Sequence, residues 1–223
     1  MRLTKVLFVA VLCLTFSNIF AYDNIKFKVK KECDLVISND IIESCYDTKL
    51  KAVRMVKYTI DGKKAYLKNI EKRPTWKYNK NIPKNERSTN GDYYKSGFDR
   101  SHLAFDSAYD YDYDTLKIIY DLNINAIPMY PRVNRYSWKS VEIYAMIKAV
   151  EFGKLDVIDY IVYPQTPKVV GNGVCVSSGF YKILINDENN FYECYYYKND
   201  NNIKFTKYDK HKISCENIEF KLK

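Results

Sequence analysis

One uninterrupted segment, residues 134–152, constrains the fold of this chain more than any other feature. It contains no Gly or Pro, and Trp138, Val141 and Ala145 recur along it at helical spacing. Gly153 follows as a typical helix stop. Segments rich in β-forming residues stand on both sides of this helix, over residues 51–58, 157–163, 173–185 and 191–197. A long helix set among strands predicts an α+β fold.

The chain before the helix alternates between short elements and loops. Residues 51–58 and 64–67 flank the tight-turn pair Asp61-Gly62, which predicts a hairpin. A short strand is expected over residues 98–103, and Asp114 is placed to cap a short helix over residues 115–120. Surface loops are expected where polar residues or prolines gather, over residues 74–97, 109–114 and 125–131.

The first 21 residues have the features of a signal peptide. Arg2 and Lys5 precede the short apolar stretch 6–16, and Ile19-Phe20-Ala21 offers a cleavage site. The stretch is too short to span a bilayer, which predicts a protein exported to a periplasm or to the extracellular space, without stable membrane association. Anchoring through an uncleaved signal is the alternative.

The mature length of about 200 residues suits a single domain. Residues 22–48 are expected to form a disulfide-tied N-terminal extension, and residues 49–223 a single domain that includes the C-terminal tail. The sequence does not indicate an oligomeric state.

Export makes the cysteines interpretable as disulfide partners. One of the six leaves with the signal, so five remain and at most two bridges can form within the chain. Proximity in sequence suggests Cys33 with Cys45 and Cys194 with Cys215, although sequence alone does not fix the connectivity. Cys175 lies in an apolar run, where a buried free thiol is expected. No C-x-x-C motif occurs that would suggest a metal site.

The formal net charge of the chain is +9. Basic residues dominate residues 49–95, whereas residues 106–114 are acidic. A basic segment attracts phosphate groups and makes binding dependent on salt concentration. Since basic exported proteins without a nucleic-acid role are common, charge alone does not assign a function.

A group of polar residues around the predicted helix suggests a chemistry. Arg100 and His102 lie in the short strand, and Asn134 and Glu142 lie in the helix. Phosphodiester hydrolysis needs a proton acceptor for water, and an imidazole with a pKa of about 6.5 suits this task. The leaving oxygen can be neutralised by Mg²⁺, and the planar fork of arginine matches phosphate oxygens.

The predicted strand and helix determine which side chains can meet. On a strand, Arg100 and His102 project from one face, and Asp99 and Ser101 from the other. Asn134 offers a neutral oxygen ligand, and Mg²⁺ commonly keeps several waters. Glu142 lies two turns further, about 12 Å along the helix axis, so that it would reach the same ion through water.

Each of these residues also has an ordinary structural explanation. Asn134 alone resembles a helix cap, Trp138 a core residue and Glu142 a surface charge. Only their order and spacing favour the functional interpretation. His211 lies between two lysines near the C-terminus and is expected to be solvated.

The motifs resemble those of the DNA/RNA non-specific endonucleases, a family with the ββα-metal fold. Residues 99–103, Asp-Arg-Ser-His-Leu, match the family motif Asp-Arg-Gly-His-Leu. Residues 125–129, Asn-Ala-Ile-Pro-Met, resemble Asn-x-x-Pro-Gln, and the spacing of Asn134, Trp138 and Glu142 matches Asn-x-x-x-Trp-x-x-x-Glu. The similarity runs from about residue 53 to residue 182. It implies antiparallel sheets with a long metal-bearing helix.

The resemblance also implies roles for individual residues. His102 would be the general base, Asn134 the direct ligand of Mg²⁺, with Mn²⁺ as a substitute, and Glu142 the organiser of metal-bound water. Arg100 and Asn125 would support the phosphate and the geometry of the site. By the same resemblance, Arg87 in the basic loop would be a further phosphate-binding residue.

The sequence departs from the family pattern at several positions. Ser101 replaces the motif glycine, Met129 replaces glutamine, and Met146 stands where the family has a phosphate-contacting arginine. Phe105 and Ser107 replace the usual Pro and Ala. These changes leave the residues that carry the chemistry in place.

We therefore expect an exported, Mg²⁺-dependent, sugar-non-specific endonuclease that hydrolyses DNA and RNA. The first alternative is a weakened or inactive protein of the same fold that binds nucleic acid. The second is a disulfide-tied surface or adhesion protein without a nucleic-acid role. Metal-dependent nicking of plasmid DNA separates the active endonuclease from the inactive binding protein. Retention on heparin or DNA tests the surface or adhesion protein.

Overall fold

The computed structural model describes residues 33–67 and 70–218. The expected signal peptide and residues 22–32 of the expected extension lie outside these ranges. Within them, no helix combines the length and the apolar character that crossing a membrane would require.

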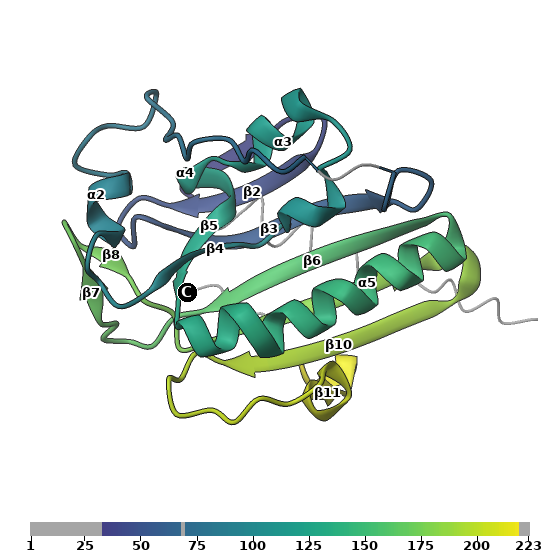
Figure 1. Cartoon of the computed structure of the whole chain (residues 1–223). Coiled ribbons are helices and arrows are strands. Elements are labelled where there is room, and N and C mark those ends of the chain that lie inside the picture. The colour runs from purple at the N-terminus through teal and green to yellow at the C-terminus, as the bar shows by residue number, and fades with distance from the viewer. Residues whose placement is uncertain (1–32, 68–69, 219–223) are drawn as a thin grey trace, which may run out of the picture.

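The centre of the molecule is a seven-stranded sheet in which every neighbouring pair is antiparallel (Figure 1). Its order is β1-β2-β3-β6-β9-β10-β11. The strands are β1 (Leu35–Ser38), β2 (Ile42–Asp47), β3 (Ala52–Asp61), β6 (Lys154–Val162), β9 (Gly179–Asn186), β10 (Phe191–Lys198) and β11 (Lys212–Ile213). Together with the long helix, this sheet confirms the predicted α+β class.

The long helix, α5 (Lys139–Phe152), continues from a π-helical turn, Val133–Trp138. Its apolar stripe packs into the main core, where Trp138, Val141 and Ala145 are fully buried. The helix ends at Gly153, whose φ of 83° lies in the region that glycine adopts without strain. The prediction of one helix over residues 134–152 is therefore confirmed, except that its first turn is wider than an α-helix.

The predicted hairpin after residue 58 is wrong. Strand β3 runs to Asp61 and pairs with β2 and β6, and residues 62–66 form turns instead of a returning strand. The backbone N–H of Gly62 donates to the carbonyl of Gly153 at 2.9 Å. A Cβ on Gly62 would lie 1.9 Å from the carbonyl oxygen of Ala149, so this glycine allows the turn to approach the end of α5.

A second, two-stranded sheet positions the site. It pairs β4 (Asp99–His102) with β5 (Ala126–Met129) in antiparallel register, with His102 opposite Ala126. The strand expected at residues 98–103 is confirmed. The loop expected at residues 125–131 is wrong, because α4 (Leu122–Asn125) runs into β5 and all four β5 residues are buried.

The short elements differ from the prediction in detail. Helix α3 (Tyr113–Ile119) is capped by Asp112, whose side chain accepts from the N–H of Thr115 at 2.8 Å, instead of by Asp114. The solvated loop predicted over residues 109–114 is wrong at its start, where Tyr109 and Asp110 are buried, whereas residues 112–114 are exposed. The remaining short elements are α2 (Asn90–Tyr93), β7 (Val169–Val170) and β8 (Val174–Cys175).

The described part of the predicted N-terminal extension belongs to the main sheet, since β2 pairs with β3 along its whole length. Both suggested disulfides are present, Cys33–Cys45 and Cys194–Cys215. Cys45 and Cys194 contribute to a smaller apolar cluster separate from the main core. Cys175 is a buried free thiol, as predicted.

His211 is not the solvated residue that the sequence suggested. Its ring stacks on Tyr197 with the centroids 4.0 Å apart, and its nitrogens contact Thr206 Oγ1 and the carbonyl of Tyr196. His211 therefore has a packing role at the edge formed by the C-terminal segment.

Candidate active site

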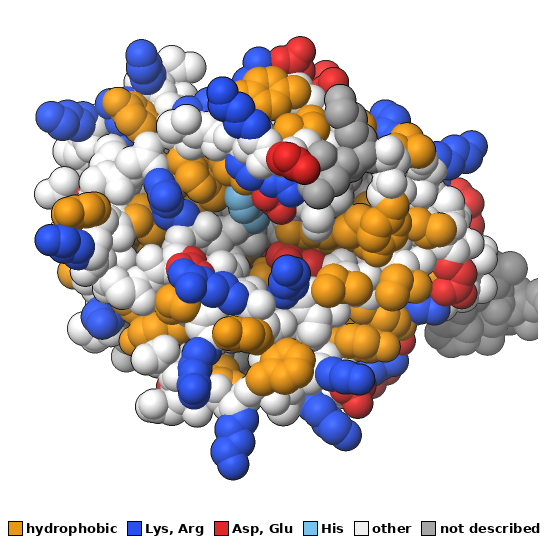
Figure 2. All heavy atoms as spheres, in the orientation of Figure 1, with side chains coloured by type: hydrophobic (Ala, Val, Ile, Leu, Met, Phe, Trp, Pro, Cys, Tyr) orange, Lys and Arg blue, Asp and Glu red, His pale blue; other side chains and the backbone are white. Residues whose placement is uncertain are grey.

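A cavity of about 380 Å³ opens where β4 meets the π-helical turn and the first turn of α5. Figure 2 shows this hollow, with a histidine side chain inside it and lysines and arginines around its rim. Four of the predicted site residues line it together, namely Arg100, His102, Asn134 and Glu142.

His102 is held between aromatic rings at the end of β4. It stacks on Trp76 at a centroid distance of 4.3 Å and meets the edge of Tyr120 at 4.5 Å. Its Nε2 atom is buried and has no hydrogen-bond partner among the described residues. Burial, together with the nearby charges of Arg73 and Arg100, lowers the pKa of His102 to about 4, against an opposing contribution from Asp106. The imidazole is therefore neutral at physiological pH.

Asn134 is fixed by two side chains on the opposite face of β4. Its Nδ2 donates to Asp99 Oδ2 at 2.9 Å, and its Oδ1 accepts from the hydroxyl of Ser101 at 2.7 Å. Arg135 forms a two-point ion pair with the same Asp99 carboxylate. Burial opposes the ionisation of Asp99, but the bonds from Arg135 and Asn134 lower its pKa overall.

The two faces of β4 thus have separate tasks. Asp99 and Ser101 hold the amide of Asn134, whereas Arg100 and His102 line the cavity from the other face, as the alternation of a strand requires. Arg100 is exposed, and its Nη1 donates to Asn90 Oδ1 at 2.6 Å. The guanidinium group is held at the rim of the cavity by this contact.

Glu142 reaches the cavity from α5. Burial raises the pKa of its carboxyl to about 8, while the charge of Lys182 acts in the opposite direction. The neighbouring carboxylates Asp106 and Asp159 raise it further. A positive charge brought into the cavity would favour the ionised form of Glu142.

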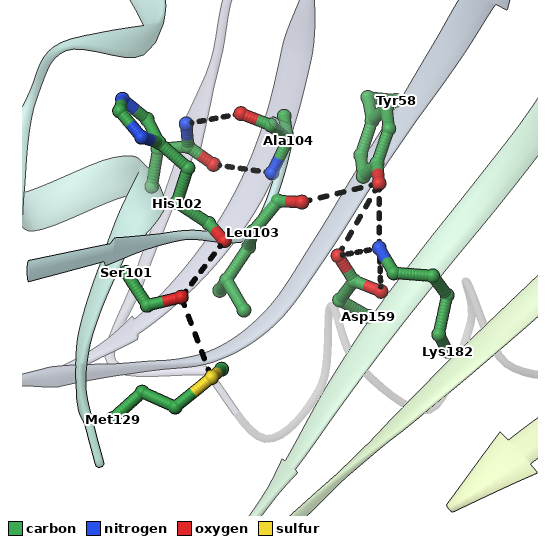
Figure 3. Close-up of polar contacts among 9 residues, drawn as sticks. Tyr58, Ser101, His102, Leu103, Ala104, Met129, Asp159 and Lys182 are labelled. Atoms are coloured by element: carbon green, nitrogen blue, oxygen red, sulfur yellow. Dashed lines mark hydrogen bonds and ion pairs between the residues drawn. The ribbon is translucent and has the colours of Figure 1, made fainter. Parts of the chain in front are cut away.

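A buried polar network lies behind this site (Figure 3). Lys182 on β9 and Asp159 on β6 are fully buried, and the ammonium lies 2.8 Å from both carboxylate oxygens. Lys182 also donates to the hydroxyl of Tyr58, which donates in turn to the carbonyl of Leu103 at 3.1 Å. The network therefore joins the centre of the large sheet to the residue that follows His102.

Two predicted site residues lie outside the cavity. Asn125 is fully buried, and its amide group bonds both the N–H and the carbonyl of Ala104, at 2.7 and 2.8 Å. Arg87 donates to three backbone carbonyls of its own loop and stacks on Tyr78 at 4.5 Å. The structure thus brings neither side chain to the cavity.

Sequence reasoning missed several cavity-lining residues, among them Arg73, Asp106, Arg135 and Lys139. Arg135 and Lys139 flank Asn134 and Glu142 within the helical motif, so their proximity could have been anticipated. Arg73 comes from a distant loop without a motif, and it pairs with Asp106 at 3.1 Å. Met146, at the position of the missing family arginine, is buried.

The oxygen donors in the cavity suit a hard divalent cation. The amide of Asn134 and the carboxyl groups of Asp106 and Glu142 line the same space. The described residues contain no cluster of three His, Cys, Asp or Glu side chains of the kind that holds a metal by protein ligands alone. The donor set therefore fits an ion that keeps most of its water shell.

Comparisons with known proteins place this chain in a family. The family model of the DNA/RNA non-specific endonucleases matches residues 22–221. Among solved structures, the fold is similar to a chain in the crystal structure of the EndoG/EndoGI complex, with a TM-score of 0.69 and 20% sequence identity. That match covers 81% of this chain and 80% of the other. The sequence comparison with curated proteins gives no significant match. The protein is a DNA/RNA nuclease that belongs to the DNA/RNA non-specific endonuclease family.

Proposed function

We propose that this protein is an exported, sugar-non-specific endonuclease that hydrolyses the phosphodiester bonds of DNA and RNA with the help of a divalent cation. The observation that carries the proposal is the convergence of His102, Asn134, Glu142 and Arg100 on one cavity. These side chains come from β4 and from the helix that begins beside it.

His102 is the general base in this proposal. The imidazole is neutral at physiological pH and can therefore accept a proton from an attacking water. A neutral imidazole carries a proton on one ring nitrogen and keeps the other as a proton acceptor. The stack on Trp76 and the edge of Tyr120 fix the ring plane, which favours a constant direction of attack.

Asn134 would hold the cation directly and Glu142 would hold it through water. We assign Mg²⁺ to this position, with Mn²⁺ as a substitute, because the available donors are oxygens. Such an ion, when bound, neutralises charge on the leaving oxygen. Glu142 would lose its proton as the cation enters, since a nearby positive charge lowers the pKa of a carboxyl group.

Positive side chains would bind the substrate. Arg100 is exposed at the rim and carries the planar fork that fits phosphate oxygens, and Lys139 adds a further charge beside Glu142. These groups recognise the backbone, so that base sequence would not be selected. Asn125 acts on the site through Ala104, and we assign Arg87 to the structure of its loop instead of to substrate.

The proposal of export rests on the N-terminal sequence and on the two disulfides. Disulfides persist in oxidising compartments, such as a periplasm or the extracellular space. Nucleic acid is the partner that this function requires, as substrate.

Digestion of plasmid DNA and of RNA by the mature protein tests the function. We expect cleavage of both with Mg²⁺ and none with EDTA. His102→Ala and Asn134→Ala should each abolish cleavage, whereas Tyr113→Ala, at an exposed position that does not line the cavity, should retain it. Undiminished cleavage by the His102→Ala protein would remove the proposed base.

One observation favours a second candidate, a weakened nuclease that mainly binds nucleic acid. The hydroxyl of Ser101 donates to Asn134 Oδ1, the atom that would face the cation. A hydroxyl that occupies one lone pair of this oxygen competes with metal binding. Binding of DNA without metal-dependent nicking would support this candidate.

A further inference from the structure

A second groove lies directly beside the catalytic cavity. Its volume is about 300 Å³, and Arg100 lines both spaces. The other walls come from α2 and the turn that follows it, which supply Asn90, Tyr94 and Lys95, and from Phe98 and Asp99 at the start of β4. Because Arg100 is bonded to Asn90, its guanidinium group extends from β4 toward this groove.

The groove combines an exposed aromatic surface with positive charge. The side chain of Tyr94 is 74% exposed, and the ammonium of Lys95 lies 5.3 Å from the centre of its ring. Lys95 has a φ of 52°, a conformation that a non-glycine residue adopts at a cost and that turns the chain sharply at this point. The ring of Tyr94 therefore contributes little to the core and is available to a ligand in the groove.

The groove is free of uncompensated negative charge along its described walls. Its acidic residue, Asp99, is paired with Arg135 and bonded to Asn134. Arg100 and Lys95 therefore dominate the local potential, which attracts phosphate groups. Phe98, which also lines the groove, is buried, and the ammonium of Lys168 lies 5.1 Å from the centre of its ring.

We propose that this groove binds the nucleotide next to the cleaved phosphate, with its base stacked on Tyr94 and its phosphate held by Arg100 and Lys95. This inference rests on the proposed function and extends it to the class of substrate. A base can stack on a protein ring only when its face is free, so the groove selects unpaired nucleotides. The protein would therefore bind single-stranded DNA or RNA more tightly than duplex at this position.

Binding measurements in a protein that cannot cleave test the inference. The His102→Ala protein is titrated with a fluorescent single strand, and separately with the matching duplex, in EDTA and at moderate salt. Adding Tyr94→Ala should raise the Kd for the single strand about tenfold, the usual consequence of losing one stacked base, and change the Kd for duplex less than about twofold. Tyr94→Phe should preserve single-strand binding, because the ring remains.

Tyr113 provides a matched control. It is 44% exposed, carries the ammonium of Lys117 at 5.2 Å from its ring, and lies outside both spaces. Tyr113→Ala should leave both dissociation constants unchanged. An unchanged single-strand Kd for Tyr94→Ala, or an equal loss with duplex, would overturn the inference. If the wild-type protein still cleaves DNA in that case, the proposed function stands without the groove. Conversely, the wild-type protein could fail to cleave nucleic acid while its single-strand binding still depends on Tyr94. That result would support the inference about the groove and refute the proposed endonuclease function.

Discussion

Replacing Lys182 by methionine tests whether the buried network behind the site supports both folding and catalysis. Lys182 and Asp159 form an ion pair that is fully shielded from water. Methionine keeps most of the side-chain volume but removes the charge, so Asp159 is left as a buried carboxylate without its partner. Breaking a buried ion pair in this way costs about 3–5 kcal/mol. We expect the free energy of unfolding in urea to fall by that amount at pH 7.

The pH dependence of this loss has a definite sign. Burial raises the pKa of Asp159 to about 6 even with Lys182 beside it. A carboxyl group whose pKa is raised by folding favours the folded state below its unfolded pKa and opposes it as pH rises through the folded pKa. Lys182 lowers the pKa of Asp159, so in Lys182→Met this carboxyl takes up its proton at a pH above 6. The deficit should therefore shrink as the pH falls from 8 toward 6 and change little below that, because the wild-type carboxyl is then protonated too.

A double variant completes the test. In Lys182→Met with Asp159→Leu no buried charge remains, and stability should recover by several kcal/mol, because apolar replacement of a whole buried pair is commonly near neutral. Cleavage should remain reduced in the double variant, since the hydroxyl of Tyr58 has lost the groups that hold it at the carbonyl of Leu103. A loss below about 1 kcal/mol in the single variant, or no recovery in the double one, would refute the reasoning.

Two further predictions concern the cavity itself. Because the pKa of His102 is about 4, we expect cleavage to continue down to pH 5 and to decline only as the pH approaches 4. A pH–rate profile of kcat/KM that falls with a midpoint near 6.5 would contradict this expectation. Adding Ser101→Gly to the His102→Ala protein should tighten Mn²⁺ binding about fivefold in calorimetric titration. The reason is that a hydrogen bond worth about 1 kcal/mol no longer competes for Asn134 Oδ1. Weaker binding would show instead that the hydroxyl orients the amide.

The sequence alone was sufficient for the features that depend on local pattern. The spacing of Trp138, Val141 and Ala145 predicted the helix, and Gly153 its end, because the periodicity of a buried stripe follows from helix geometry. The pairing of near cysteines also held, since short separations keep them close. Alternation along β4 correctly separated the face of His102 from the face that holds Asn134.

Tertiary structure decided the features that depend on residues far apart in sequence. Pro128 and Pro131 suggested a loop over residues 125–131, but pairing with β4 and complete burial make residues 126–129 a strand. Asp61-Gly62 looked like a hairpin turn, but the sheet offers β3 a more distant partner, β6, and the turn packs on the end of α5.

The same division applies to the site. The motif identified His102, Asn134 and Glu142 because their chemistry and spacing are encoded locally. Arg73 entered the cavity and Arg87 stayed outside it for reasons that no local pattern contains, since each position depends on how a long loop folds against the two sheets. The sequence by itself therefore determined the groups that we propose to react, and the packing of distant segments determined their environment, because burial and charge are properties of neighbours in space.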